Sequence, residues 1–186
     1  MDAFSYLSVL LSIIIGLAMT QVLQGYRSLL LNRKRVKLFF PPMAWSACLL
    51  LIAVQMWWSS FGLADRTEWN FLTFLIILLQ TIFLYMLAGL VLPDVPPAEP
   101  IDLEAHYFRE RVPFGAMLGA SVVTSAGKNL LLDGRFTSMG DLTFHIVFFA
   151  LAVAIVAIRR AWVHHLLAAA VSIALVAYIA ILFARL

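Results

Sequence analysis

The stretch SYLSVLLSIIIGLAMTQVLQGYR, residues 5–27, decides the fold class. Most of its positions are Leu, Ile, Val, Met or Ala, and it is long enough to cross the hydrocarbon core of a bilayer, which takes about 20 apolar residues. Its polar residues recur every three or four positions and so form one line on a helix: Ser5, Ser8, Ser12, Gly16, Thr20, Gln24 and Arg27. The pattern predicts a membrane-spanning helix whose polar line faces protein or water.

The composition of the whole chain indicates the same surroundings. Of its 186 residues, 63% are hydrophobic and 12% are charged, whereas a soluble domain is typically about half apolar and about a quarter charged. The net charge of +3 comes from basic residues beside hydrophobic runs, where such residues report membrane orientation and not nucleic-acid binding. We therefore predict an all-α integral membrane protein whose partner is the lipid bilayer, with no nucleic acid.

Six apolar runs predict a six-transmembrane-helix bundle that forms a single membrane domain over residues 1–186. The expected spans are residues 4–27, 42–62, 69–92, 113–132, 141–159 and 162–184. Residues 93–112 form the one long connection. Its second half is expected to be either a solvated linker or an amphipathic helix on the membrane surface, with Tyr107 and Phe108 on lipid and Arg109 and Arg111 in water.

Lysine and arginine gather in two of the links between the expected spans. Arg33, Lys34, Arg35 and Lys37 follow the first span, and Arg159 and Arg160 follow the fifth. The positive-inside rule puts both links in the cytoplasm. With six spans, both termini then lie outside, the linker 93–112 is cytoplasmic, and the expected location is a bacterial inner (plasma) membrane.

Two segments resemble each other, GYRSLLLNR at residues 25–33 and GKNLLLDGR at residues 127–135. Each is followed by a link and an aromatic-rich span. The similarity has two interpretations: two inverted three-helix repeats, as in many secondary transporters, or a chance match in leucine-rich sequence.

Two glutamines are expected near the middle of the membrane. At about 1.5 Å per residue, Gln55 lies about 18 Å into the second span and Gln80 about 15 Å into the third, in a core about 30 Å thick. They are either hydrogen-bonding contacts between helices or ligand-binding groups.

The fourth span repeats the polar line of the first, with Ser121, either Thr124 or Ser125, and Lys128 at helical spacing, and with Asn129 beside Lys128. An ammonium group at that depth is costly unless it reaches the outer surface, pairs with Asp133 or Asp141, or faces an anionic ligand. Asp141 and His145 are one turn apart on the fifth span. They are expected to bond each other, either as a helix-capping pair or as a proton-handling pair.

Motifs of hydrolases, metal sites and phosphate-binding loops are absent, and no Asp or Glu lies in the middle of an expected span. We therefore expect no enzyme, no metal and no cofactor. Gly115 and Gly119 form a small-residue face suited to close helix contact, which includes contact between copies in a homo-oligomer.

Two functions are consistent with this pattern. The first is a small-solute or ion transporter or channel with a polar path between the first and fourth spans. The second is a non-transporting membrane sensor, a receptor for a lipid or hydrophobic ligand, or an accessory subunit, in which the same polar residues join helices. The length of the polar line in residues 5–27 favours the first. The candidate ligand or pathway residues are Ser12, Gly16, Thr20, Gln24, Gln55, Gln80, Ser121, Ser125, Lys128, Asn129, Asp141 and His145.

Overall fold

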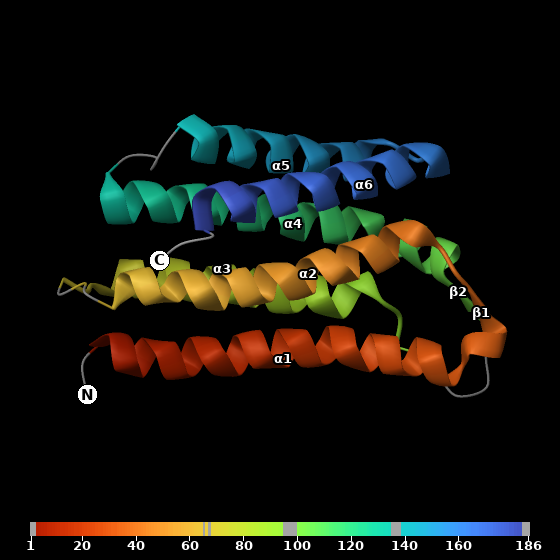
Figure 1. Cartoon of the computed structure of the whole chain (residues 1–186), viewed down its shortest axis with the longest axis horizontal. Coiled ribbons are helices and arrows are strands. Elements are labelled where there is room, and N and C mark those ends of the chain that lie inside the picture. The colour runs from red at the N-terminus through yellow and green to blue at the C-terminus, as the bar shows by residue number, and fades with distance from the viewer. Residues whose placement is uncertain (1–2, 65, 67, 95–99, 135–138, 184–186) are drawn as a thin grey trace.

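The computed structural model describes residues 3–64, 66, 68–94, 100–134 and 139–183. Within these ranges six long helices run side by side (Figure 1): α1 (Ala3–Leu31), α2 (Phe40–Ser59), α3 (Phe71–Val91), α4 (Leu103–Asp133), α5 (Met139–Ala157) and α6 (Ala161–Tyr178). Shorter segments are the 3₁₀ helices η1 (Arg33–Arg35) and η2 (Ser60–Leu63), the π-helical η3 (Ile179–Phe183), and the strands β1 (Val36–Lys37) and β2 (Ile101–Asp102). We call the end of the bundle with β1 and β2 the strand end, and the opposite end the η2 end.

Five helical segments in the described ranges are long and apolar enough to cross a membrane: α1, α2 with η2, α3, α5 and α6. The chain is therefore an all-α bundle with five candidate membrane-spanning helices. α4 contains the expected fourth span, 113–132, but it carries charged and polar residues along its length and is not among the five. The sixth span and the inverted three-helix repeat stay predictions.

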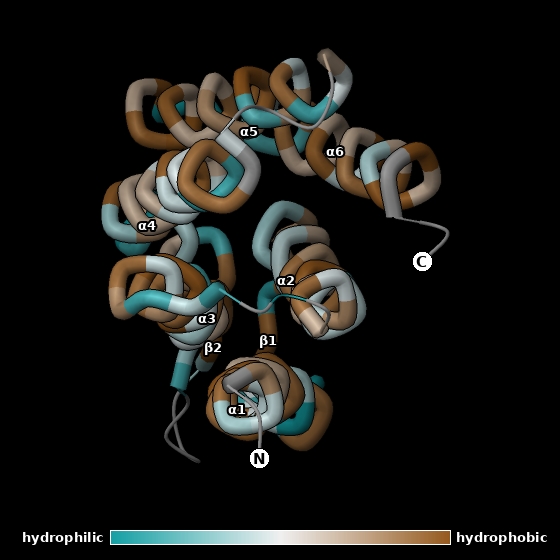
Figure 2. Tube along the Cα trace, turned by 90° about the vertical axis from the view of Figure 1, so that its left-hand side faces the viewer, coloured by the Kyte–Doolittle hydropathy of each residue, from teal (hydrophilic) through white to brown (hydrophobic). Residues whose placement is uncertain are grey.

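The helices are arranged so that α1 and α4 do not face each other. α1 packs mainly against α2 and α3, whereas α4 packs mainly against α3 and α5. In the view along the bundle, α1 lies at one side and α3 lies between it and α4 (Figure 2). The predicted path between the first and fourth spans is therefore wrong.

α1 turns its apolar face inward and its polar line outward. Its buried residues include Leu7, Leu11, Ile15, Ala18 and Val22, and its exposed residues include Ser12, Gly16, Thr20 and Gln24. Two of these polar groups have partners without a facing polar helix: the Thr20 hydroxyl donates to the Gly16 carbonyl at 2.8 Å, and the Trp57 Nε1–H donates to Ser12 Oγ at 3.2 Å. Both lines have helical spacing, and close packing selects the apolar one.

The second half of the linker 93–112 is helical, as one of the two expected alternatives has it, but it is not a separate surface helix, since Tyr107 and Arg111 are buried. Ile101–Asp102 pairs in parallel with Val36–Lys37, and the Asp102 carboxylate caps the N-terminus of α4 by accepting from the backbone N–H groups of Glu104 and Ala105. From Leu103 the chain belongs to α4, which runs on through Pro113. These capping bonds and the Lys37 ammonium, 3.0 Å from Asp102 Oδ2, hold the pKa of the Asp102 carboxyl below its usual range.

The first third of α4 supplies hydrogen-bond donors to the ends of two other helices. Arg111, which is 6% exposed, donates through Nη1 to the carbonyls of Ile155, Val156 and Ile158 at the end of α5. His106 Nε2 donates to the carbonyl of Leu90, near the end of α3. Terminal carbonyls lack partners within their own helix, so these bonds explain why charged residues expected in water are buried here.

α4 and α5 approach closely at Gly115, and this contact gives a stability prediction with a matched control. A Cβ added at Gly115 would lie 2.6 Å from Val156 Cγ2 and 3.1 Å from the carbonyl oxygen of Ala152, whereas one added at Gly119 meets nothing closer than 3.8 Å. We expect Gly115→Ala to lower the free energy of unfolding by about 1–3 kcal/mol through overpacking. Gly119→Ala should change it by less than about 0.5 kcal/mol. Thermal unfolding in detergent measures both, and equal melting temperatures would contradict the packing described.

Candidate functional site

A chamber of about 430 Å³ lies inside the bundle towards the η2 end, which is within the usual range for small-molecule sites, about 300–1,000 Å³. Its walls come from all six long helices, α1 to α6, together with η2 and Arg66. Polar side chains are frequent among the lining residues, although these helices are otherwise largely apolar: Gln55, Ser59, Ser60, Arg66, Gln80, Thr81, Ser121, Ser125, Lys128, Asn129, Asp141, His145 and Tyr178.

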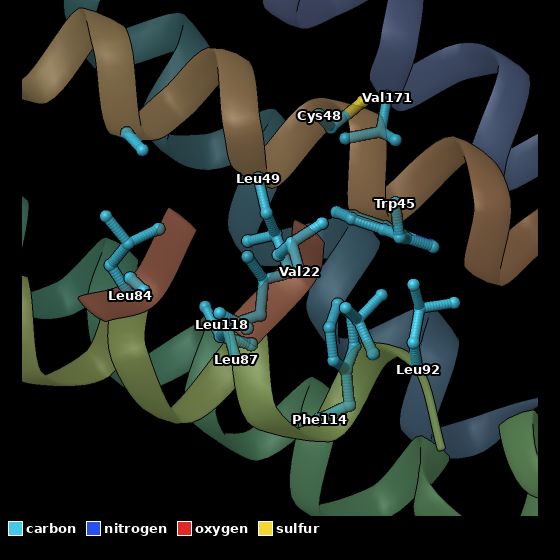
Figure 3. Close-up of a cluster of buried hydrophobic side chains, with 14 of the residues drawn as sticks. Val22, Trp45, Cys48, Leu49, Leu84, Leu87, Leu92, Phe114, Leu118 and Val171 are labelled. Carbon is cyan, nitrogen blue, oxygen red and sulfur yellow. The ribbon is translucent and has the colours of Figure 1, made fainter. Parts of the chain in front are cut away.

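A cluster of buried apolar side chains lies on the strand-end side of the chamber (Figure 3). Trp45 and Phe114 meet edge to face with ring centroids 5.3 Å apart, and Leu49, Leu87 and Leu118 are buried around them. Leu118 belongs both to this core and to the chamber wall. The space is therefore partly open and borders an apolar floor on its strand-end side.

A hydrogen-bonded network joins α4 to α5 on the chamber wall. Asn129 Nδ2 donates to Asp141 Oδ2 at 2.8 Å. His145 Nδ1 lies 2.8 Å from the backbone carbonyl oxygen of Asp141 and 3.4 Å from the carboxylate Oδ1 of the same residue. The other ring nitrogen, His145 Nε2, lies 3.1 Å from Ser125 Oγ. A carbonyl only accepts, so in the neutral imidazole Nδ1 carries the proton and Nε2 accepts from Ser125. The predicted contact between Asp141 and His145 is confirmed, and its use for proton handling stays a prediction.

Gln55 on α2 and Gln80 on α3 both line the chamber, as do Ser121 and Lys128 on α4. Counting from the ends of their helices at about 1.5 Å per residue, Lys128 lies near the η2 end, and Ser121 lies about 10 Å deeper. Counted in the same way, Gln80 lies about 14 Å from the η2 end of α3, whereas Gln55 lies about 6 Å from the η2 end of α2, at a level similar to that of Lys128. Gln80 and Ser121 thus form an uncharged polar zone below the charged entrance. Of the partners considered for Lys128, Asp141 lines the same chamber, and the side chain of Asp133 lies outside the described residues.

The other four candidate residues do not reach this chamber. Ser12, Gly16, Thr20 and Gln24 are exposed on the outer face of α1, and this helix contributes the apolar Leu11 to the lining. Eight of the twelve predicted residues thus line the chamber, whereas the four from the polar line of α1 do not.

Arg66 is a lining residue that the sequence pattern does not single out. It lies between η2 and α3, where Nε donates to the Glu68 carbonyl at 3.0 Å and Nη1 donates to the Leu132 carbonyl near the end of α4 at 3.3 Å. In the sequence it is one charged residue in a short polar link beside Glu68, which is typical of a solvated turn. Only its bond to α4 distinguishes it.

Within the described ranges no group of three or more His, Cys, Asp or Glu side chains is placed to hold a metal ion. Comparison of the chain with known protein families, with characterised proteins and with solved structures finds no match. The functional argument therefore depends on the chamber itself.

Proposed function

We propose that this membrane protein binds a small polar solute in the chamber and carries it across the bilayer. The observation that supports this is a space of about 430 Å³ lined by amides, hydroxyls and charged groups inside a bundle of apolar helices. Polar groups at membrane depth are costly, so they usually face one another, water or a ligand. A partly open chamber that borders an apolar floor suits a carrier that opens to each side in turn, whereas an open channel would need a continuous path.

In this proposal α4 is a sixth span, and its polar face is hidden from lipid because it lines the chamber. The strand end is cytoplasmic by the positive-inside rule, since the basic residues of two links lie there: Arg33, Lys34, Arg35, Lys37, Arg159 and Arg160. The chamber then opens to the outside.

A second function is favoured by the apolar floor. Trp45, Leu49 and Phe114 are buried there, and Arg111 joins α4 to the end of α5 below them. A receptor that binds a ligand from outside and signals through helix movement needs such a seal and never opens it.

Cysteine labelling tests solute access and separates the two functions. In a Cys48→Ala background, we expect Ser121→Cys to react from outside with a membrane-impermeant maleimide, because Ser121 lines the chamber. The matched control is Val123→Cys on the same helix, since Val123 is 58% exposed on the bundle surface and would face lipid.

Inside-out vesicles provide the second half of the test. A carrier exposes Ser121→Cys to the cytoplasmic side in part of its cycle, so labelling from that side is expected. Labelling from outside alone would indicate a receptor. If Ser121→Cys were as unreactive as Val123→Cys from both sides, the chamber would not be open to water and the proposal would fail.

A further inference from the structure

We infer that the passage between the chamber and the strand end follows one face of α4, and that the side chains of Trp45 and Phe114, here called the ring pair, close it. This inference depends on the proposed solute binding and adds the route through the apolar floor. The route joins the chamber to a second cavity, which lies on the other side of the ring pair.

The second cavity is much smaller than the chamber, with a volume of about 10 Å³. Its lining comes from the strand-end parts of three helices, the beginning of α2, the end of α3 and the first third of α4. A space of this volume is roughly the smallest that holds one water molecule. Both rings of the ring pair belong to its lining, so they separate it from the chamber.

The lining of the small cavity includes hydrogen-bonding side chains: Tyr107, Glu110 and Arg111. The Trp45 Nε1–H is buried and has no hydrogen-bond partner of good geometry among the described residues, although Tyr107 lies beside it. The Tyr107 hydroxyl donates to His164 Nδ1 at 2.8 Å, because His164 Nε2 donates to a backbone carbonyl, and the Tyr107 oxygen can still accept a bond. A polar molecule that passed the rings would therefore meet both a donor and an acceptor.

One face of α4 lines both cavities. Its lining residues follow one another at alternating steps of four and three positions, which is the spacing of a single helix face. They are Tyr107, Arg111 and Phe114 at the small cavity, followed by Leu118, Ser121, Ser125, Lys128 and Leu132 at the chamber. The same face of α4 is thus a wall of both spaces.

The barrier between the two cavities is thinnest along this face. On α4 the lining of the small cavity ends at Phe114 and that of the chamber begins at Leu118, one turn or about 6 Å further on. The corresponding gap is about 10 Å on α2, from Trp45 to Ile52. On α3 it is about 14 Å, from Thr81 to Leu90. The shortest connection therefore runs along α4.

The ring pair blocks this connection. Trp45 is 1% exposed and Phe114 is 4% exposed, and the Phe114 side chain points towards Trp45 (Figure 3). The two rings belong to different helices, α2 and α4, and meet edge to face. Because the barrier beside Phe114 is one turn thick, a displacement of these two side chains is sufficient to join the cavities.

Replacing one ring with a smaller side chain tests the route. The reporter is Ser121→Cys in the Cys48→Ala background, labelled in inside-out vesicles with the membrane-impermeant maleimide. We expect Phe114→Leu to raise the labelling rate from the cytoplasmic side by about tenfold, because the smaller side chain leaves a gap opposite Trp45. Labelling from outside should keep its rate, which shows that the variant is folded and its chamber intact.

Three further variants show whether the position of the ring matters. Trp45→Leu widens the same gap from α2 and should have the same effect as Phe114→Leu. Leu84→Ala is the matched control within the floor, since Leu84 is 2% exposed on α3, where the barrier is thicker, and it should leave the rate unchanged. Trp58→Leu removes a ring from the outer surface of α2, where it is 39% exposed, and should also leave the rate unchanged.

The possible results separate the route from the proposed solute binding. If Ser121→Cys reacts from outside but neither Phe114→Leu nor Trp45→Leu raises its labelling from the cytoplasmic side, the route is overturned and solute binding stands. The same conclusion follows if Leu84→Ala raises the rate as much as Phe114→Leu does. If Ser121→Cys reacts from neither side in any variant, the chamber is closed and both proposals fail.

Discussion

Replacing Arg111 with methionine is expected to lower the free energy of unfolding by about 3 kcal/mol, a large fraction of the 5–15 kcal/mol typical of a folded domain. The guanidinium is buried and is a shared donor to three backbone carbonyls at the end of α5. Methionine fills much of the same volume but donates nothing, so these carbonyls lose their partner where water has little access. Thermal unfolding in detergent and the yield of folded protein in membranes both measure the loss.

Two further variants show whether the hydrogen bonds are responsible. Arg109→Met removes a neighbouring charge whose side chain is 70% exposed and paired with Glu110, and it should change stability by less than about 0.5 kcal/mol. Arg111→Lys keeps the charge but not the planar donor group, so it should recover only part of the loss. If Arg111→Met unfolded at the wild-type temperature, the capping of α5 by α4 would contribute nothing to stability.

This capping explains why the first third of α4 could not be predicted from the sequence. The residues from Leu103 to Val112 alternate between charged and apolar, which is typical of a surface helix. Their hydrogen-bond acceptors lie at Leu90 and at residues 155–158, far away in the chain. A hydropathy pattern is local and contains no information about such partners.

The helices themselves were predictable, because an apolar run of about 20 residues has few alternatives to a buried or membrane-spanning helix. The sequence pattern of α1 could not show which face of the helix packs against the other helices and which face is exposed. Leu7, Leu11 and Ile15 repeat with the same helical spacing as Ser12, Gly16 and Thr20, so the period predicts two faces without saying which is inside. The second set can stay on the outer face because its groups are small, with Thr20 bonded to the Gly16 carbonyl and Ser12 bonded to Trp57 on α2.

The chamber was predictable in part for a related reason. Ser125, Asn129, Asp141 and His145 lie on two consecutive helices that pack together, so their nearness in the chain becomes nearness in space. Gln55 and Gln80 were found from their depth alone. Arg66 was missed because its position depends on a bond from a short link to the end of α4.

Filling the chamber is expected to have the largest effect on function. Ser125 lines the chamber wall nearer the η2 end than Ser121 does. The phenyl ring of Ser125→Phe would therefore fill the part of the chamber between Ser121 and the η2 end. We expect the labelling rate of Ser121→Cys from outside to fall by about tenfold or more, because water and reagent are excluded from the space that the ring fills.

Stability and control variants decide how that result is interpreted. The ring enters open space, so Ser125→Phe should stay folded, apart from the lost bond between Ser125 and His145, worth about 1 kcal/mol. Ser125→Ala loses the same bond but leaves the space open, and it should label normally at Ser121→Cys. Gly16→Leu changes the polar line of α1, where an added Cβ meets nothing within 4 Å, and it should leave labelling unchanged. If Gly16→Leu blocked labelling while Ser125→Phe did not, the pathway would follow the outer face of α1, and the chamber would lose its proposed role.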